Sequence, residues 1–366
     1  MADFVNPSRI GQANLAGDVD ALFLKVFSGE IITTFEKFNV MMPLHRVRTI
    51  SSGKSAQFPV TGVASAKYHV PGESVLSEAS GTSLFAASAS AGSPTTSFDS
   101  GNSPASKYLN RFKHNEKVIF IDDVLVSSVF VADIDEMKNH YDVRSIYSTE
   151  IGRALAYTAD KNLIRTVIAG ARKTTDRFGG SDATLLGAQV GVGAAPTGAS
   201  IINGLFGVAQ KMDEANVPSE ERYAILRPDI YYKLVADGKD ALDRDYGNDA
   251  NGSIAGGEVL SVAGIRILKS NHLPTANESS TQDALHGADG VKNDVSGTSG
   301  AGYSGLNFTG TRGIVFHRES IGTVKLMDLS LESEYQMERL GTLMLAKYAM
   351  GHNVLREECC YELINT

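Results

Sequence analysis

The sequence has almost no cysteine, and this limits the kinds of protein it can be. Of its 366 residues only Cys359 and Cys360 are cysteines, and they are adjacent. Neighbouring cysteines form a disulfide only with strain, so the pair does not indicate the disulfide framework of a secreted protein. We interpret both as small buried apolar residues rather than as redox or metal-binding groups.

An excess of positive charge and a long apolar run are also missing. The net charge is −8, with 34 Lys and Arg against 42 Asp and Glu. Tight binding of DNA of any sequence depends on basic side chains that displace counterions, so we do not expect it. No apolar stretch approaches the ~18 residues of a membrane helix, and the first twenty residues lack the pattern of an export signal. We expect a soluble protein made in a reducing cytoplasm.

Neither of two glycine-rich motifs completes a nucleotide-binding site. In SGKSA (52–56) the Gly-Lys-Ser looks like a phosphate-binding loop, but Arg48 stands where that loop needs its first glycine. The residues after it, AQFPV, indicate an extended segment instead of the helix that should face a phosphate. In GVGAAP (191–196) proline replaces the third glycine of a dinucleotide fingerprint. We exclude both interpretations.

Metal-binding and catalytic patterns are equally incomplete. The acid-rich loop that begins at Asp243 and Asp245 lacks the glycine and glutamate of an EF-hand at the required positions. Asp283, His286 and Asp289 are three residues apart, but they lie in a glycine-rich tract that would not hold them in place. The eight histidines form no i, i+4 pair, and a nucleophile elbow is missing. We expect no catalytic residue, metal or cofactor, which favours a structural protein over an enzyme.

Helical periodicity is clearest over residues 142–170. Ile151, Leu155, Ala159 and Leu163 recur every four residues, Asp142 is a candidate N-cap and Gly170 a candidate stop. Further helices are predicted over 20–40, over 200–218 and in PDIYYKLVAD. Strands are predicted in RYAILRP, in GEVLSVAGIRILKSNHLP and in the C-terminal part, and residues 275–312 are predicted to be a surface loop. The mixture of helices and mostly antiparallel strands predicts an α+β fold.

Two extended segments enclose a serine-rich stretch. Residues 44–76 and 118–134 alternate between apolar and polar side chains, and ten of the thirty residues in 77–106 are serine. We interpret the whole as a long β-hairpin with a mobile tip. A hairpin of this length is marginal in water on its own, so it should lie against another surface.

Charge is unevenly distributed around this hairpin. Residues 37–117 contain nine Lys and Arg against four acids, a net of +5, whereas 118–142 contain six acids and one base, a net of −5. Opposite charge on an extended arm and on the body suggests that the arm of one copy docks on the body of the next; ordinary surface charge is the alternative. The candidate intersubunit residues are Arg46, Arg48, Lys54, Lys67, Arg111, Lys113, Asp122, Asp123, Asp133, Asp135 and Glu136.

Several segments together resemble one protein family. They are ALFLKVFSGE, VRTISSGKSAQFPV, PGES, HNEKVIFIDDVLVSSVFVADIDEMKNHYDVRSIY, IGTVKLMDLSLE and AKYAMGH. In this order they look like the major capsid protein of short-tailed bacteriophages of the T-seven type, over most of the chain. The sequence departs from that family in the serine-rich stretch 77–106 and the polar tract 275–312, which concern surface details.

The resemblance implies the Hong Kong 97 capsid fold with defined parts. These would be an N-terminal arm (1–50), an E-loop hairpin (51–118) with the Ser-rich insert 77–106, a P-domain (119–195) with a spine helix (143–170), an A-domain (196–305) and returning P-domain strands (306–366). It further implies hexamers and pentamers of the chain, an icosahedral virion head around double-stranded DNA, a scaffolding protein, a portal at one vertex, accessory head proteins and assembly in the host bacterial cytoplasm.

Three other functions remain open from the sequence. An encapsulin-like nanocompartment shell would have the same fold and enclose cargo enzymes instead of DNA. A tail or fibre adhesin would form trimers and would not need the amphipathic helix. A hydrolase would depend on residues such as Asp243, Asp245 or His286. Some relatives of this fold also join subunits through Lys–Asn bonds, and Lys54, Lys67 and Lys107 lie near the hairpin, but the T-seven-type resemblance argues against such cross-links.

Overall fold

The computed structural model describes most of the chain outside its N-terminal region and four further segments, which lie within 63–113, 135–142, 238–260 and 280–304. The described residues are 34–35, 38–62, 66, 68–69, 71, 114–134, 143–237, 252–253, 258–259, 261–279, 293, 302–303 and 305–365. The chain divides into two compact units, which we describe separately. The first comprises Met1–Gln57 and Val118–Thr366, and the second comprises Phe58–Lys117.

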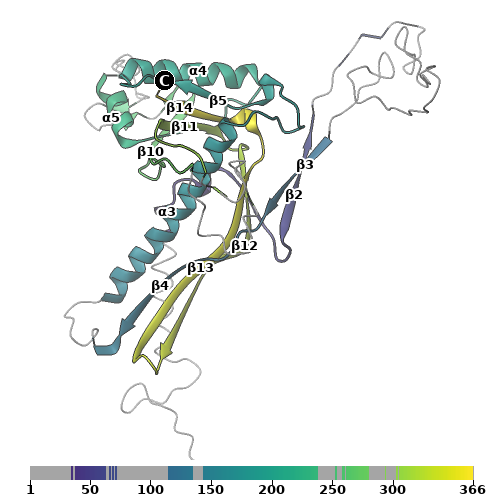
Figure 1. Cartoon of the computed structure of the whole chain (residues 1–366). Helices are drawn as coiled ribbons and strands as arrows, with labels where there is room; N and C mark the ends of the chain where they lie inside the picture. Colours follow the sequence, from purple (N-terminus) through teal and green to yellow (C-terminus); the bar gives the residue numbers. More distant parts are fainter. Residues whose placement is uncertain are drawn as a thin grey trace, which may run out of the picture. The chain divides into compact units, whose positions relative to one another are not determined.

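A four-stranded sheet belongs to the first unit (Figure 1). Its strands in spatial order are β1 (Arg46–Thr49), β12 (Ile321–Gln336), β13 (Gly341–Val354) and β4 (Leu125–Ala132). β12 and β13 form a long antiparallel hairpin, β4 pairs antiparallel with β13, and β1 runs parallel to β12. The two edge strands of the sheet are therefore β1 and β4.

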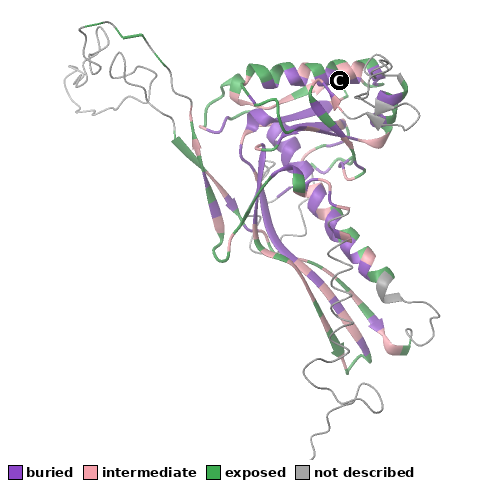
Figure 2. Ribbon diagram, turned by 180° about the vertical axis from the view of Figure 1, so that it is seen from behind, coloured by how far each residue is buried: buried purple, intermediate pink, exposed green. Residues whose placement is uncertain are grey.

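The helix α3 (Val143–Ala171) covers one face of this sheet with its first half. Ile151 and Leu155 of α3 belong to one buried cluster with Tyr348 of β13, and Val129 of β4 packs against it. The next residue of β4, Phe130, points to the other face and is exposed, as the period of two in a strand requires. Figure 2 shows this alternation along the lower part of the sheet, where half-buried residues alternate with exposed ones in β4 and with buried ones in much of β13.

A six-stranded mixed sheet forms the second layer of the first unit. In spatial order its strands are β5 (Ala188–Gly191), β14 (Cys360–Ile364), β11 (Thr311–His317), β6 (Arg222–Leu226), β10 (Ile265–Lys269) and β9 (Ser261–Val262). β10 pairs parallel with β6 and β14 pairs parallel with β5, whereas the other neighbours are antiparallel.

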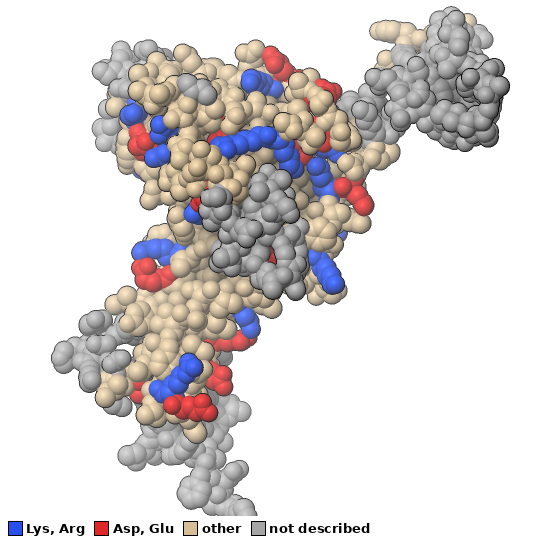
Figure 3. Space-filling model, in the orientation of Figure 1, with Lys and Arg blue, Asp and Glu red and all other residues tan. Residues whose placement is uncertain are grey.

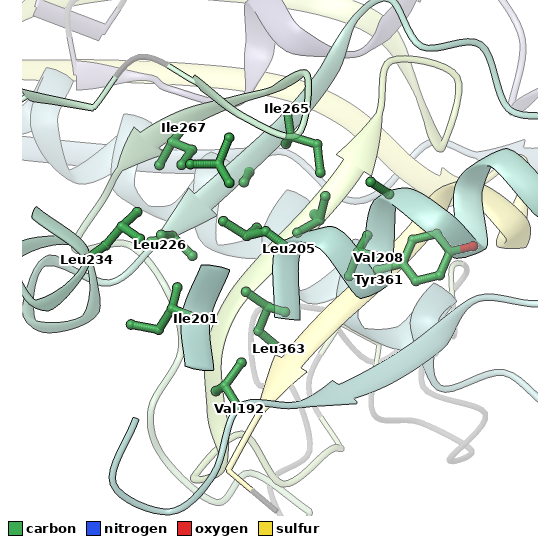
Figure 4. Close-up of a cluster of buried hydrophobic side chains, with 14 of the residues drawn as sticks. Val192, Ile201, Leu205, Val208, Leu226, Leu234, Ile265, Ile267, Tyr361 and Leu363 are labelled. Carbon is green, nitrogen blue, oxygen red and sulfur yellow. The ribbon is translucent and has the colours of Figure 1, made fainter. Parts of the chain in front are cut away.

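Both faces of the six-stranded sheet are covered by helices. α4 (Gly198–Glu214) and α5 (Pro228–Asp237) lie on one face, where Leu205 and Val208 gather with Leu226, Ile265 and Leu363 (Figure 4). The second half of α3 lies on the other face. Each fully buried aliphatic side chain of this kind stabilises the fold by about 1.5–3 kcal/mol. The sheet is therefore the centre of the largest core.

Burial alternates along the central strands of this sheet. Ala224 of β6 faces the α4 and α5 side, while its neighbour Ile225 faces α3. Likewise Val315 of β11 faces α4 and α5, and Ile314 and Phe316 face α3. A strand that is apolar on both faces is what a doubly covered sheet requires.

The remaining elements are short. β2 (Ser55–Thr61) pairs with β3 (His114–Phe120) in a two-stranded sheet, and β7 (Gly252–Ser253) pairs with β8 (Glu258–Val259). Three 3₁₀ turns are η1 (Met42–Leu44), η2 (Ala183–Leu185) and η3 (Glu357–Cys359). The boundary between the two compact units crosses β2 and β3.

Most helices and strands in the described residues were predicted from periodicity. The helix predicted over 142–170 is α3, the helix in PDIYYKLVAD is α5, and the strand in RYAILRP is β6, so these predictions are confirmed. The helix predicted over 200–218 is α4, but it ends at Glu214, because Asn216 adopts a positive φ of 55° that a helix cannot continue. Cys359 and Cys360 are buried and unbonded to each other, as expected.

The prediction of one long hairpin from 44–76 and 118–134 is wrong in its return strand. β3 pairs with β2, but β4 leaves that pair and joins β13 instead. The strand is interrupted at residues 121–124, where Asp122 turns inward to bind Tyr303 and Asn293. The first predicted segment, 44–76, is also split between two sheets. Its strand β1 pairs with β12, whereas its strand β2 pairs with β3.

The prediction of a surface loop over 275–312 is wrong for several residues. Asn293, Tyr303 and Phe308 are buried, and Thr311 already belongs to β11. The sheets are also more mixed than predicted, with three parallel pairings among the described strands. The six-stranded sheet combines strands from the predicted segments 119–195, 196–305 and 306–366, whose boundaries stay predictions. Asp142, most of the helix predicted over 20–40 and the insert 77–106 lie outside the described residues.

Candidate functional site

The basic candidate residues that the structure describes lie on and after the edge strand β1. Arg46 and Arg48 are exposed, as is every residue of β1, and Lys54 is exposed in the turn before β2. One Nη of Arg48 donates a hydrogen bond of 3.2 Å to the carbonyl oxygen of Gln57. The strand thus presents two guanidinium groups on an open sheet edge. Lys67, Arg111 and Lys113 lie outside the described residues.

The acidic candidates differ from one another in their surroundings. Asp123 is exposed, but the carboxylate of Asp122 is used inside the unit, where it accepts hydrogen bonds from Tyr303 and Asn293. Asp133 accepts a hydrogen bond from the hydroxyl of Tyr335. Asp135 and Glu136 lie outside the described residues. The half-buried carboxylate of Asp122 is therefore bonded within its own subunit, whereas Asp123 is exposed.

An exposed apolar group that the sequence reasoning missed lies at the turn between β12 and β13. Its members are Ile134, Tyr335, Met337 and Leu340, which are 60%, 49%, 73% and 67% exposed; we call them the β12–β13 tip. Met337 and Leu340 lie in the turn itself, Tyr335 lies at the end of β12, and Ile134 follows β4, whose end is bonded to the turn. Four large apolar side chains in one place are more than the isolated exposed residues that are normal on a surface. The sequence YQMERL contained a signal, since it joins two strands by a turn that includes apolar residues and no glycine.

Two contacts hold the β12–β13 tip in place. The backbone N–H of Asp133 donates to the carbonyl of Leu340 at 3.1 Å, and the Tyr335 hydroxyl donates to Asp133 Oδ2 at 2.8 Å. The hydrogen bond to the carboxylate raises the pKa of Tyr335 above its ordinary value. Leu340 has a φ of +48°, a backbone conformation that a leucine adopts only at a cost. The tip is thus fixed in a shape that leaves its apolar side chains in solvent.

The exposed face of the four-stranded sheet continues this apolar surface. Val126 and Phe130 of β4 are exposed, and in the strand register Phe130 lies opposite Leu343 of β13. Leu343 in turn lies opposite Glu334 of β12. Near the tip the face is therefore apolar on β4 and β13 and acidic on β12, while farther along β13 Lys347 forms an ion pair with Glu332 of β12.

The segment before β1 is anchored to α3 by one buried carboxylate. Asp160 is fully buried, and it accepts hydrogen bonds from the N–H groups of Val40 (2.8 Å) and Met41 (3.0 Å) and from Nδ1 of His272 (2.8 Å). A buried carboxylate requires such partners, because an unpaired one would be strongly destabilising. The N-terminal segment therefore enters the sheet from a fixed point on the helix.

A second anchor for this segment is a buried chain of two histidines and a threonine. The ring of His45 is bonded through Nδ1 to the Met41 carbonyl and through Nε2 to Thr323 Oγ1, and Thr323 Oγ1 is bonded to Nδ1 of His352. Burial lowers the pKa of His45 to about 4 and that of His352 to about 3. Both rings are neutral at pH 7, and they connect the residue before β1 to β12 and β13.

Buried carboxylates near the C-terminus bind the end of α3. Glu362 accepts a bidentate pair of 2.7 Å hydrogen bonds from Arg172 and further bonds from Thr311 and Gln189. The neighbouring buried Glu357 and Glu358 pair with basic residues of the same region, Lys173, Arg177 and Arg356. Together these contacts fix β14 against the helix.

Within the described residues, groups of three or more side chains that could hold a metal ion are absent, and no helix is long and apolar enough to cross a membrane. The face in Figure 3 carries acidic and basic side chains interspersed among uncharged ones. The features of the described surface that could contact another protein are therefore the edge strands, the β12–β13 tip and the mixture of acidic and basic side chains.

Comparison with known proteins adds direct evidence of relationship. The model of the Gp10A-like major capsid protein family matches residues 98–364. The major capsid protein of Escherichia phage T7 is 33% identical over 353 residues, which are 94% of this chain and 91% of the relative. The major capsid protein of Enterobacteria phage T3 is 31% identical, over 97% of this chain and 94% of the relative. The solved capsid structure of cyanophage P-SCSP1u is similar with a TM-score of 0.67 and 39% identity, over 98% of both chains.

Proposed function

Since this chain belongs to the Gp10A-like family of phage major capsid proteins, we propose how its copies contact one another in the capsid shell. The family assigns it a structural function in the virion and no enzymatic one. The fold is that of phage capsid subunits.

The main support for this proposal is the exposure of the β12–β13 tip. Its four apolar side chains are between 49% and 73% exposed, and its hydrogen bonds fix it in that exposed form. When a partner covers an apolar surface, each Å² removed from water lowers the free energy by roughly 25 cal/mol. This gain drives association. In a shell the partner that covers the tip is another copy of the chain. Each contact is modest, and the shell gains strength from many of them acting together.

The edge strand β1 supplies the second proposed contact. Its exposed Arg46 and Arg48, with Lys54 nearby, form the basic side of the contact, and Asp123 belongs to the acidic side. Complementary charge selects partner and register more than it adds affinity. Asp122 is less suited to this role because its carboxylate is bonded inside its own subunit. The other candidates of the proposed contact are Lys67, Arg111, Lys113, Asp133, Asp135 and Glu136.

Contacts between unlike patches generate closed rings, and we infer that the chain forms both hexamers and pentamers. The shell would enclose double-stranded DNA, with a scaffolding protein during assembly, a portal at one vertex and accessory head proteins. Assembly would take place in the host bacterial cytoplasm. The net charge of −8 suits a container that must release DNA, because a strongly basic lining would hold it.

The test is to purify the chain after expression with a scaffolding protein and to examine it by electron microscopy and sedimentation. Closed shells are the expected result. Particles recovered from infected cells should yield double-stranded DNA, whereas a nanocompartment of the encapsulin kind would yield cargo protein. A chain that stays a monomer under all these conditions contradicts the proposal.

A further inference from the structure

One asparagine side chain takes the place of a neighbouring strand where β3 ends. Asn293 is only 1% exposed. Its Oδ1 accepts a 3.1 Å hydrogen bond from the Phe120 N–H, and its Nδ2 donates a 2.6 Å hydrogen bond to the Phe120 carbonyl. Both polar groups of one backbone residue are thus satisfied by a single amide, as a paired strand would satisfy them.

The same amide also holds the carboxylate of Asp122, within the interruption of the strand. Nδ2 of Asn293 donates a 2.8 Å hydrogen bond to Asp122 Oδ1, while the Tyr303 hydroxyl donates to Oδ2 and accepts from the His352 N–H at 2.9 Å. Burial, together with the charge of Asp122, raises the pKa of Tyr303 well above its ordinary value, so the hydroxyl keeps its proton and its role as donor. Two residues distant in sequence therefore bind one carboxylate from both sides.

Backbone contacts tie this point to strands on either side. The N–H of Asp122 donates to the Met350 carbonyl at 3.3 Å, and the N–H of Ile121 donates to the Lys54 carbonyl at 2.9 Å. A Cβ on Gly351 would collide with the Phe120 carbonyl oxygen, so this close approach requires glycine. The end of β3 is thus held by β13, by the residue before β2 and by Asn293.

We propose that Asn293 is a positioning residue for assembly. It fixes residues 120–122, where β3 ends and the chain turns toward β4, and it acts through them rather than by touching a neighbouring copy. The inference rests on the proposed function, because the conformation of residues 120–122 matters for assembly only in a chain that forms a shell.

The chemistry of the site explains why an amide is needed there. The Phe120 N–H needs an acceptor, while the Phe120 carbonyl and the Asp122 carboxylate both need a donor. An asparagine offers an acceptor and two donor hydrogens on one planar group, whereas a carboxylate of the same size offers acceptors alone. An aspartate at position 293 would also place a second negative charge beside Asp122.

The test compares two variants of this residue with a matched control. Asn293→Ala removes all three hydrogen bonds without adding charge. Asn293→Asp keeps the acceptor for Phe120 but loses both donated bonds. The control is Asn307→Asp, since Asn307 is exposed and its Oδ1 accepts hydrogen bonds from Thr309, a role that a carboxylate retains.

Two measurements are made on each protein, the yield of closed shells and hydrogen exchange of the unassembled subunit. Both Asn293 variants should lower the shell yield by about tenfold or more, and the amides of residues 118–122 should exchange about tenfold faster, the factor that corresponds to about 1.4 kcal/mol. The amides of α3 and of the six-stranded sheet should exchange as before, and Asn307→Asp should match the unmodified protein.

If both Asn293 variants form shells in the yield of the unmodified protein, the inference is overturned. It is also overturned if amide hydrogen exchange becomes faster throughout the subunit, because that would show a general loss of stability instead of a local one. Failure of the inference is distinguishable from failure of the proposed function. If the unmodified chain and the Asn307→Asp control form no shells, the proposed function fails, and local exchange at 118–122 still decides whether Asn293 fixes this turn.

Discussion

The hydroxyl of Tyr335 donates a 2.8 Å hydrogen bond to the carboxylate of Asp133, which joins the end of β4 to the last residues of β12. This contact holds the β12–β13 tip beside the edge strand. It also gives Asp133 a definite role inside the subunit at the place where apolar side chains are most exposed. The tip therefore already has its exposed conformation in the single subunit, before it forms the contact that we propose.

Replacing an apolar residue of the tip should separate assembly from folding. Met337→Asp puts a charge where an interface should exclude water, so shell yield should fall by about tenfold or more, as for a central interface residue. Met337 is 73% exposed in the subunit, so the free energy of unfolding should change by less than about 0.5 kcal/mol. Ser219→Asp, at an exposed position between α4 and β6, is the control. Normal shells from Met337→Asp would show that the tip lies outside the contacts.

Reversing charge on the basic edge should block assembly in a salt-dependent way. The triple variant Arg46→Glu, Arg48→Glu and Lys54→Glu should leave a folded subunit that fails to form shells at low salt, because like charges would face each other. Circular dichroism checks the fold and sedimentation checks the shells. Since the Debye length shortens from about 10 Å at 0.1 M to about 3 Å at 1 M salt, high salt should restore part of the yield. Unchanged assembly at low salt would count against charge-guided docking.

Acid should weaken the anchor of the N-terminal segment. Burial lowers the pKa of His45 to about 4 and that of His352 to about 3, whereas an unfolded histidine titrates near a pKa of about 6.5. The unfolded chain therefore binds more protons below about pH 6.5, and the stability that the neutral rings provide above this pH is lost progressively as the pH falls toward about 4. Nearby Asp160 favours the protonated form of His45 and Lys325 opposes it.

The check is the free energy of unfolding measured from about pH 7 to pH 4 in His45→Gln and in the control His114→Gln, since His114 is exposed. For His45 alone the loss is on the order of 3 kcal/mol over this range. His45→Gln should show a shallower dependence on pH, and His114→Gln should match the unmodified protein. Equal slopes in all three proteins would show that His45 is not the titrating group.

Breaking one buried ion pair should cost far more than breaking an exposed one. Arg172→Met leaves the fully buried Glu362 without its bidentate partner, and a loss of about 3–5 kcal/mol is expected. Arg318→Met breaks the exposed pair with Glu221 and should cost less than about 1 kcal/mol. Urea unfolding of both variants gives the comparison. Similar losses in the two variants would mean that the buried network adds little.

The sequence was most informative where the residues that decide a structure are close together. The four-residue spacing of Ile151, Leu155 and Ala159 predicted α3 almost to its ends, because a helix depends on neighbours within one or two turns. The fold and the function, in contrast, were implied by the resemblance of several segments to a known family. These local signals cover the helices and most of the strands that the structure describes.

Contacts between distant residues account for the errors. Asp122 is a candidate intersubunit residue from the sequence, which stays a prediction, but its partners inside the subunit, Asn293 and Tyr303, are 171 and 181 residues away, and local alternation gives no sign of them. For the same reason the return strand of the hairpin was extended through residues 121–124. The apolar tip was missed because exposure depends on how β4, β12 and β13 are placed, which periodicity alone does not fix.

The helix α3 packs against both large sheets of the first unit, since Ile151 and Leu155 pack with the four-stranded sheet while Leu163 and Val167 pack with the six-stranded one. Its 29 residues make a rod of about 43 Å at about 1.5 Å per residue. Because the helix packs against a different sheet at each end, a rotation at one end displaces the other. A tilt of about 10° moves the far end by about 7–8 Å. If the chain forms both hexamers and pentamers, as we propose, its copies can thus fit different curvatures through a small rotation of one layer that displaces the other by several ångströms.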